Sequence, residues 1–249
     1  MKRVYLYNHI KTGNKILISD EPAHYIKHVL RMNPGSTFCA FDGSGNEYIL
    51  KIKKISLNAI ESEIVEEKYT EEKEPEISIE LCLCLCKNKT FENILKKAAE
   101  IGVSTIIPIK SARSVSDVDD KKSFVKIERW KKIAAEGSKI AGRTRIPEII
   151  KVENFETVIS RNVPGILFWE QSRMPIKDIL NNLSSKIKEE RSITIFIGPE
   201  GGFTDEEVKK TIRNQIFVAS LGPRILSVET ASILALGIVS YELGFFSNK

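Results

Sequence analysis

Two patterns of apolar and polar residues divide the chain near residue 75. The earlier part contains short apolar runs, and the clearest pair lies in residues 36–55, STFCAFDGSGNEYILKIKKI. Residues 42–46 separate these two runs, and their Asp, Gly and Asn favour a tight turn between paired strands. The first part of the chain is therefore predicted to be mostly β, as a small β-barrel.

A short helix is predicted ahead of this hairpin. It covers about residues 21–31 and stops before Pro34 and Gly35, which favour a turn. Helical spacing places His24, His28 and Arg31 along one side of this helix.

Strands alternate with helices in the later part of the chain. Apolar strand candidates lie at 77–86, 104–109, 165–169, 192–198 and 216–221. Helical stretches lie near 90–101, 123–141, 175–189, 204–214 and 229–246. This alternation indicates parallel β-α-β units and an α/β fold whose sheet is covered on both faces. Sheets of this kind bind ligands at the carboxyl ends of their strands.

Length and composition favour two domains without a membrane segment. The chain has 249 residues, 42% of them hydrophobic, which is enough for a sizeable core. No apolar stretch approaches the roughly 20 residues of a membrane helix. The N-terminus, MKRVYLYNH, lacks the long apolar region of a signal peptide. We therefore expect a cytoplasmic protein.

The cysteines indicate a buried strand. Residues 81–86 read LCLCLC, so in a strand the three sulfurs project from one face and the leucines from the other. A thiolate metal site would need two-residue gaps within pairs and a second pair, whereas Cys39 is the only other cysteine. We therefore expect the cysteines to pack as small buried apolar side chains and to bind no metal.

Charge is distributed unevenly along the chain. Residues 61–76 carry eight Glu and two Lys, a net charge of −6, which leaves +11 on the rest of a chain whose total is +5. A basic body favours a polyanionic partner, although a lysine-rich solvated surface explains the same charge. The acidic stretch contains Pro75 and is the best candidate boundary, predicting domains at 1–70 and 76–249.

The loop IGPEGGF, residues 197–203, follows an apolar strand and is the first candidate ligand site. Its glycines lack a Cβ, so main-chain groups can approach a ligand closely. Thr204 and Glu207 have the spacing of a capping box and predict the next helix start. The loop matches neither the dinucleotide fingerprint nor a phosphate-binding P-loop. A tight strand-to-helix turn is the simpler alternative.

A second loop repeats the Gly-Pro pair at residues 222 and 223, within SLGPRILSVETASILAL. We expect the two preceding strands to be adjacent, so that their Gly-Pro turns form opposite walls of one ligand slot. Glu229 follows and would open the last helix, where a carboxylate suits the positive end of the helix dipole.

Together these segments resemble a known family. IGPEGGFTDEEV and LGPRILSVETA are similar to the two signatures of the ribosomal RNA small subunit methyltransferase E family, within the SPOUT class. Three further segments match in the right order: KHVLRMNPGSTFCAFDGSGNEY, KAAEIGVSTIIPIKSARSV and RWKKIAAEGSKIAGRTRIPEI. Several ordered matches are more specific than either loop alone.

The resemblance implies both fold and activity. It implies an N-terminal PUA-like RNA-binding barrel and a C-terminal SPOUT α/β domain with a deep trefoil knot. The implied activity is methyl transfer from S-adenosylmethionine to N3 of a uridine in 16S ribosomal RNA, in the assembled small subunit, by a homodimer whose subunits share the active site. Two alternatives stay open: a related SPOUT enzyme acting on another RNA, and a non-catalytic RNA-binding protein.

The family likeness also implies site residues. The cofactor candidates are Leu167, Glu170, Gly198, Glu200, Gly201, Leu221, Gly222, Ile225 and Leu226. Because N3 of uracil must lose a proton, a base or an anion-stabilising cation is required. Arg143 and Arg224 are the cation candidates and Glu229 is the candidate base. The cations expected to contact RNA are Lys2, Arg3, Arg31, Arg113, Lys139 and Arg145.

The chain departs from the family pattern at two positions. Ser227 stands where the family usually has Arg, and Ile140 stands where it usually has Gln. Lys139 or Arg145 would be the nearest replacements for the missing charge.

Overall fold

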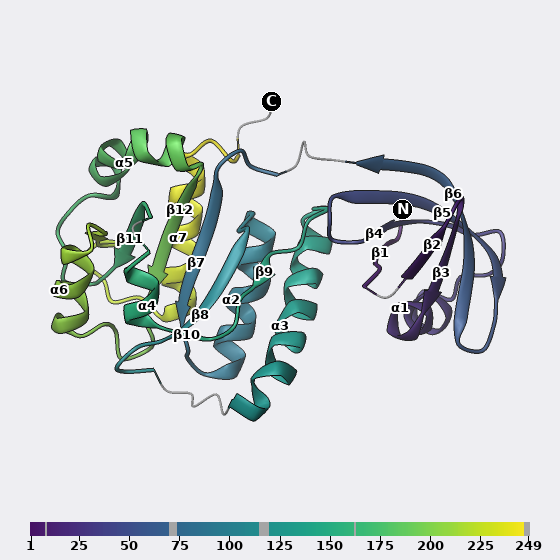
Figure 1. The fold of residues 1–249 in the computed structure, drawn as a ribbon, viewed down its shortest axis with the longest axis horizontal. Helices are drawn as coiled ribbons and strands as arrows, with labels where there is room; N and C mark the ends of the chain where they lie inside the picture. The colour runs from purple at the N-terminus through teal and green to yellow at the C-terminus, as the bar shows by residue number, and fades with distance from the viewer. Residues whose placement is uncertain (8, 70–73, 115–119, 162, 247–249) are drawn as a thin grey trace. The chain divides into compact units, whose positions relative to one another are not determined.

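A computed structural model describes the chain except residues 8, 70–73, 115–119, 162 and 247–249, and the side chains of 120–123. The described residues form two compact units (Figure 1). The N-terminal unit contains residues 1–74 together with 138–146, and the C-terminal unit contains 75–137 and 147–249.

A six-stranded sheet forms the N-terminal unit, in the order β1-β4-β5-β6-β3-β2. Its strands are β1 Arg3–Tyr5, β2 His9–Thr12, β3 Lys15–Ser19, β4 Thr37–Phe41, β5 Asn46–Ile55 and β6 Ala59–Tyr69. β1 pairs with β4 in parallel, and the other neighbours pair antiparallel. The predicted hairpin is present as β4 and β5.

The predicted first helix consists of two short pieces. An α-helical turn, α1 Asp20–His24, continues directly into a π-helical turn, η1 Tyr25–Val29. Ala23 and Ile26 point into the apolar core of the unit, where Phe38 and Leu50 are fully buried.

The acidic stretch at residues 61–76 is in large part a strand. β6 runs through its first half and lies between β5 and β3, so the stretch is not only a linker. Lysines on neighbouring strands supply the opposite charge, because Lys15 pairs with Glu61 at 3.0 Å and Lys53 with Glu63 at 2.8 Å. Cross-strand pairs of opposite charge stabilise a sheet, which explains how a strand tolerates so many carboxylates.

The C-terminal unit contains a parallel sheet, as predicted. Its order is β10-β8-β7-β12-β11-β13, with β9 beside β8, and every neighbouring pair is parallel. The strands are β7 Ser78–Cys84, β8 Thr105–Lys110, β9 Glu148–Ile149, β10 Glu153–Asn154, β11 Gly165–Phe168, β12 Ser192–Ile197 and β13 Phe217–Ala219. The sequence pattern predicted five of these strands and missed the two-residue β9 and β10.

Helices cover both faces of this sheet (Figure 1). The helices of this part of the chain are α2 Asn88–Ile101, α3 Asp120–Ile140, α4 Phe155–Ile159, α5 Ile176–Glu190, α6 Asp205–Arg213 and α7 Val228–Glu242. Trp130 of α3 packs against Phe91 of α2, with their ring centres 4.6 Å apart. Cys82 and Cys84 lie in one apolar cluster with Phe155 of α4 and Val208 of α6. Leu81 and Leu83 face the other way and are also fully buried, so the alternating strand is covered on both sides.

One expectation about this sheet is wrong. The strands that end in the two Gly-Pro turns, β12 and β13, are not adjacent, because β11 lies between them and pairs with both. Adjacency cannot be read from the sequence, since a long connection can insert a strand. None of the helices in the described part of the chain is long and apolar enough to cross a membrane.

Candidate active site

A cavity of about 650 Å³ opens in the C-terminal unit where β11, β12 and β13 end. Each strand end supplies a wall: residues 168–170 lie at the end of β11, residues 197–203 lie at the end of β12, and residues 220–222 and 224–227 follow β13. Lys87 and Thr90 at the start of α2 and Val228 and Ala231 of α7 complete the lining. The residue after a parallel strand is where such sheets place ligand groups.

The first loop needs its glycines. Gly202 has a φ of +67° and donates its N–H to the carbonyl of Pro199 at 2.9 Å, which closes the turn. A Cβ at Gly198 would lie 3.2 Å from the ring of Phe203, closer than an ordinary contact. The Glu200 carboxylate accepts a hydrogen bond from the Lys87 main-chain N–H at 3.2 Å, which ties this loop to the start of α2.

Glu207 stabilises the same loop through hydrogen bonds. Its buried carboxylate accepts hydrogen bonds from the main-chain N–H of Thr204 and of Ala112, both at 2.8 Å, and from the Thr204 hydroxyl at 3.0 Å. The predicted capping box of α6 is therefore present. The bond to Ala112 joins it to the segment after β8, from which Arg113 donates to the carbonyl of Gly201 at 2.8 Å.

The second loop is built around Gly222, whose φ is +104°. The Ser220 hydroxyl donates to the Gly222 carbonyl at 3.1 Å and accepts from the Gly222 N–H at 3.2 Å. Ser227 begins α7 by accepting a hydrogen bond from the Thr230 N–H at 3.2 Å. The family's usual cation is thus replaced here by a helix cap.

Eight of the nine predicted cofactor positions line this cavity. They are Glu170, Gly198, Glu200, Gly201, Leu221, Gly222, Ile225 and Leu226. The ninth, Leu167, does not line it, because its side chain is fully buried in the cluster that holds Phe155 and Phe196. Cofactor binding by these residues stays a prediction.

The three predicted catalytic residues lie in different surroundings. Arg224 lines the cavity, is exposed, and has no hydrogen-bond or ion-pair partner among the described residues. Glu229 is half-buried in the first turn of α7 and does not line the cavity. Arg143 belongs to the N-terminal unit, is buried, and donates to both carboxylate oxygens of Glu74 at 3.2 and 2.7 Å.

The predicted RNA-binding cations also differ from one another. Within the N-terminal unit, Arg3 is paired with Glu47 at 3.1 Å and stacks over Phe41 at 4.1 Å. The Lys139 ammonium lies 5.1 Å from the ring centre of Tyr25, and Arg145 donates to the Tyr69 hydroxyl at 2.7 Å.

The remaining cations in that set are exposed. Lys2 donates to the carbonyl of Leu30 at 2.7 Å, and Arg31 is exposed with a φ of +51°. Arg113 in the C-terminal unit donates a hydrogen bond to the Gly201 carbonyl, so its side chain helps to hold the loop at residues 197–203. RNA binding by the whole set stays a prediction.

Sequence reasoning missed several lining residues. Lys87, Thr90, Phe168, Trp169 and Ala231 were not predicted. Lys87 and Thr90 follow the LCLCLC strand, so the rule that ligands collect at strand ends was the available signal for them. The nearby Cys86 is not a nucleophile at neutral pH, because burial and then the charge of Glu200 raise the pKa of its thiol to about 12.

Comparison with known families matches both units. The description "RNA methyltransferase domain" fits residues 72–240, and "RNA methyltransferase PUA domain" fits residues 18–65.

Curated relatives match along nearly the whole chain. The Bacillus subtilis protein named ribosomal RNA small subunit methyltransferase E is 32% identical over 229 residues, which cover 90% of this chain and 89% of the relative. A protein of the same name from Buchnera aphidicola subsp. Schizaphis graminum is 30% identical over 250 residues, covering 98% of each chain.

Solved structures share the fold. A methyltransferase described from Legionella pneumophila, in complex with the bound cofactor SAM, is 26% identical with a TM-score of 0.81, covering 96% of this chain and 97% of that one. A ribosomal RNA small subunit methyltransferase E from Neisseria gonorrhoeae, bound to S-adenosyl methionine, is 23% identical with a TM-score of 0.84, covering 97% and 98%. The expected fold class, an α/β chain with an N-terminal PUA-like sheet, is confirmed. The trefoil knot stays a prediction.

Proposed function

Because the chain belongs to the ribosomal RNA small subunit methyltransferase E family of RNA methyltransferases, we propose that it methylates N3 of a uridine in 16S ribosomal RNA with S-adenosylmethionine as methyl donor. The observation that carries the proposal is the cavity at the ends of β11, β12 and β13, where two glycine loops present main-chain groups to one space.

The cavity suits an adenosyl group in size and lining. Its volume of about 650 Å³ lies in the range of small-molecule sites, roughly 300–1,000 Å³. Ile225 is 88% exposed at its edge, an unusual cost for a large apolar side chain unless a ligand covers it. Leu221 and Leu226 offer further apolar contact to the faces of adenine, and main-chain groups of the loops would bond its edge.

Two carboxylates add a charge argument. Glu170 and Glu200 both line the cavity, and the sulfonium and amino groups of S-adenosylmethionine are cationic. Opposite charges within a partly enclosed cavity attract more strongly than in bulk water. The two side chains would therefore favour the methyl donor over its neutral-sulfur product.

The methyl donor, when bound, supplies an electrophilic carbon that needs no metal. The residues of this chain have to orient uracil in line with that carbon and manage the N3 proton. We propose that Arg224, an exposed cation of the cavity with no side-chain partner among the described residues, stabilises the uracil anion. We further propose Glu229, in the first turn of α7, as the base that would accept the N3 proton of uracil while the methyl group passes from the sulfonium sulfur to N3 and that sulfur becomes neutral.

A homodimer completes the proposal. α7 carries no charged side chain from Thr230 to Tyr241, and it exposes Leu234 and Tyr241. An exposed apolar stripe on a helix is typical of a surface covered by a partner. Light scattering coupled to size-exclusion chromatography should give about twice the 28.1 kDa of one chain; a mass of one chain at micromolar concentration would contradict it.

Labelled-methyl transfer tests the activity. Small ribosomal subunits from a strain that lacks this protein are incubated with purified protein and labelled S-adenosylmethionine, and the RNA is then digested to nucleosides for mass analysis. We expect N3-methyluridine in 16S ribosomal RNA. Label at another uridine atom or another base would contradict the position, and label only in transfer RNA would favour a related enzyme class. Naked 16S RNA as a parallel substrate tests whether the assembled subunit is required.

A further inference from the structure

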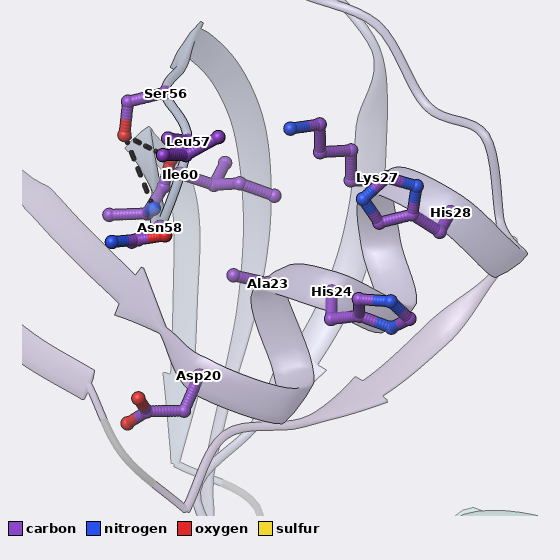
Figure 2. A pocket seen from close by; sticks show the side chains of 10 residues that line it. Asp20, Ala23, His24, Lys27, His28, Ser56, Leu57, Asn58 and Ile60 are labelled. Atoms are coloured by element: carbon purple, nitrogen blue, oxygen red, sulfur yellow. Dashed lines mark hydrogen bonds between the residues drawn. The ribbon is translucent and has the colours of Figure 1, made fainter.

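A second cavity lies within the N-terminal unit, in a place that the proposed methyl transfer does not use. It measures about 200 Å³ and lies between the α1–η1 helix and the turn that joins β5 to β6 (Figure 2). We call it the barrel pocket. Its lining residues are Asp20, Ala23, His24, Lys27, His28, Ser56, Leu57, Asn58, Ala59 and Ile60.

The helix side of the barrel pocket presents two imidazole rings and a cation. His24 and His28 are one helical turn apart, and their ring centres lie 4.5 Å from each other. Lys27 extends from the same helix toward the β5–β6 turn (Figure 2). It is half-buried and has no ion-pair partner among the described residues. A partly buried, unpaired ammonium attracts an anion more strongly than a solvated surface lysine does.

Lys27 differs from three other lysines of the unit in lacking an ion-pair partner, and from the exposed Lys51 and Lys54 in being half-buried. Lys11, Lys15 and Lys53 are each paired with a glutamate of β6. The one carboxylate of the barrel pocket, Asp20, lies at the end away from Lys27 in Figure 2 and accepts from the Ser19 hydroxyl at 3.1 Å. Among the lining residues that the structure describes, the end of the pocket that holds Lys27 therefore carries a cation and no carboxylate.

The turn side of the barrel pocket supplies an amide and an apolar surface. Ser56 exchanges hydrogen bonds with the main chain of Ala59, at 2.8 and 3.2 Å, which fixes the turn. The side chain of Asn58, in the same turn, has no hydrogen-bond partner among the described residues. Leu57 beside it is 86% exposed. An amide that both donates and accepts suits the edge of a nucleobase.

These groups together fit one class of ligand. A cation for phosphate, flat rings for stacking and an amide for a base edge are the means by which proteins hold unstacked nucleotides of single-stranded RNA. The volume admits one base or one sugar-phosphate unit and excludes a folded helix. A π-helical turn such as η1 is rare and occurs often at functional sites, and here it carries Lys27 and His28.

We propose that the barrel pocket binds one unstacked nucleotide of the substrate RNA, with its phosphate on Lys27 and its base against His24, His28 and Asn58. The inference rests on the proposed RNA methyltransferase function, and it names a contact that holds the RNA away from the reacting base. Lys27, His24 and Asn58 were not among the residues that the sequence analysis predicted to bind RNA.

The test measures binding of a fluorescein-labelled 12-nucleotide oligouridine to the full-length protein by anisotropy. We expect Lys27→Ala and His24→Ala each to weaken binding about tenfold, and Asn58→Ala about fivefold. The matched control is Lys51→Ala, an exposed lysine of β5 outside the barrel pocket, which should change affinity less than about twofold. Lys27→Ala should also reduce the slope of log affinity against log salt concentration by about one, because one phosphate contact is lost, whereas Asn58→Ala should leave this slope unchanged.

Three results would overturn the proposal. The first is equal affinity for the Lys27→Ala, Asn58→Ala and Lys51→Ala variants. The second is equally strong, Lys27-dependent binding of polyglutamate, which would make the pocket a site for acidic protein. The third is photocrosslinking of 4-thiouridine RNA to the protein with no crosslink in residues 20–28 or 56–60.

The methylation assay separates this inference from the proposed function. Wild-type protein that binds oligouridine through Lys27 but transfers no methyl group would contradict the proposed function alone. If wild-type protein methylates subunits and the Lys27→Ala variant does so with the same KM for subunits, the barrel-pocket proposal alone is contradicted. Thermal melting of each variant shows that it is folded, and because the substituted side chains are exposed or half-buried we expect unchanged midpoints.

Discussion

At the scale of single residues, Glu207 connects three parts of the candidate site. Its carboxylate begins α6, holds the segment after β8 through Ala112, and so brings Arg113 to the Gly201 carbonyl. The sequence spacing predicted the cap with Thr204. It contained no sign of the bond to Ala112, because 95 residues separate the two partners.

Replacing this carboxylate tests its function. In Glu207→Gln the amide nitrogen cannot accept, so at least one buried N–H loses its partner, and we expect unfolding to require about 1–3 kcal/mol less free energy. Urea denaturation measures the change. Glu206→Gln is the matched control, because its neighbouring carboxylate is exposed. Equal midpoints for the two variants would contradict the clamp.

Arg224 is the residue on which the proposed chemistry depends most. Removing a cation that stabilises a developing anion lowers turnover by about 10²–10³. We expect this loss of kcat in Arg224→Ala, with partial recovery in Arg224→Lys and little change in S-adenosylmethionine affinity. Single-turnover methyl transfer measures the rate. A loss of cofactor affinity with unchanged kcat would instead make Arg224 a cofactor-binding residue.

Arg143 tests a different kind of contribution. Its buried pair with Glu74 implies a structural function in the N-terminal unit. Removing one partner of a buried pair costs about 3–5 kcal/mol, so Arg143→Ala should unfold far more easily than wild type. The double variant Arg143→Met with Glu74→Leu should recover much of that stability. If this stable double variant transfers no methyl group, Arg143 has the catalytic function that the family resemblance suggested.

At the scale of elements, the turn between β4 and β5 is held by one carboxylate. Asp42 accepts from the Ser44 N–H at 2.9 Å and from the side chains of Ser44, Asn46 and Tyr48. Burial alone would raise the pKa of Asp42, but these hydrogen bonds outweigh it and hold the pKa below its ordinary value. The carboxylate is therefore more acidic in the folded chain than in the unfolded one.

This shift predicts how stability depends on pH. A depressed folded pKa gives stability that is fully present above the unfolded pKa, about 4, and is lost as pH falls through the folded pKa. At pH 7, Asp42→Asn should therefore lower the free energy of unfolding by about 1–3 kcal/mol. The difference from wild type should shrink as pH falls below about 4. Urea titrations between pH 7 and 3 measure it, and a constant difference would contradict this account of Asp42.

The predictability of elements followed their length. Long periodic segments such as α2 and α5 and the apolar strands β7 and β12 were predicted within a few residues. The two-residue β9 and β10 carry no periodic signal, and the charge of β6 concealed a strand whose lysine partners lie elsewhere in the sequence. The strand order could not be predicted from the sequence either, because β11 pairs between β12 and β13, which follow it in the chain.

At the scale of the whole molecule, the chain divides into units that are not continuous in sequence. Residues 138–146 belong by contact with residues 1–74, and the Gly45 N–H donates to the Thr144 carbonyl at 3.2 Å within that unit. The acidic stretch marked the approximate end of the first unit, but no pattern indicated this later return. The residues that line the cavity were easier to predict, because both glycine loops are motifs that follow apolar strands in the sequence.

Calorimetric titration of the full-length protein with S-adenosylmethionine tests the central claim most directly. We expect saturable binding, weakened about tenfold in Ile225→Ala because apolar contact with adenine is lost. Ile212→Ala removes another exposed isoleucine, which lies outside the cavity, and this variant should bind as wild type does. No heat with either S-adenosylmethionine or its demethylated product, or equal affinity for the two variants, would contradict a cofactor site between the glycine loops.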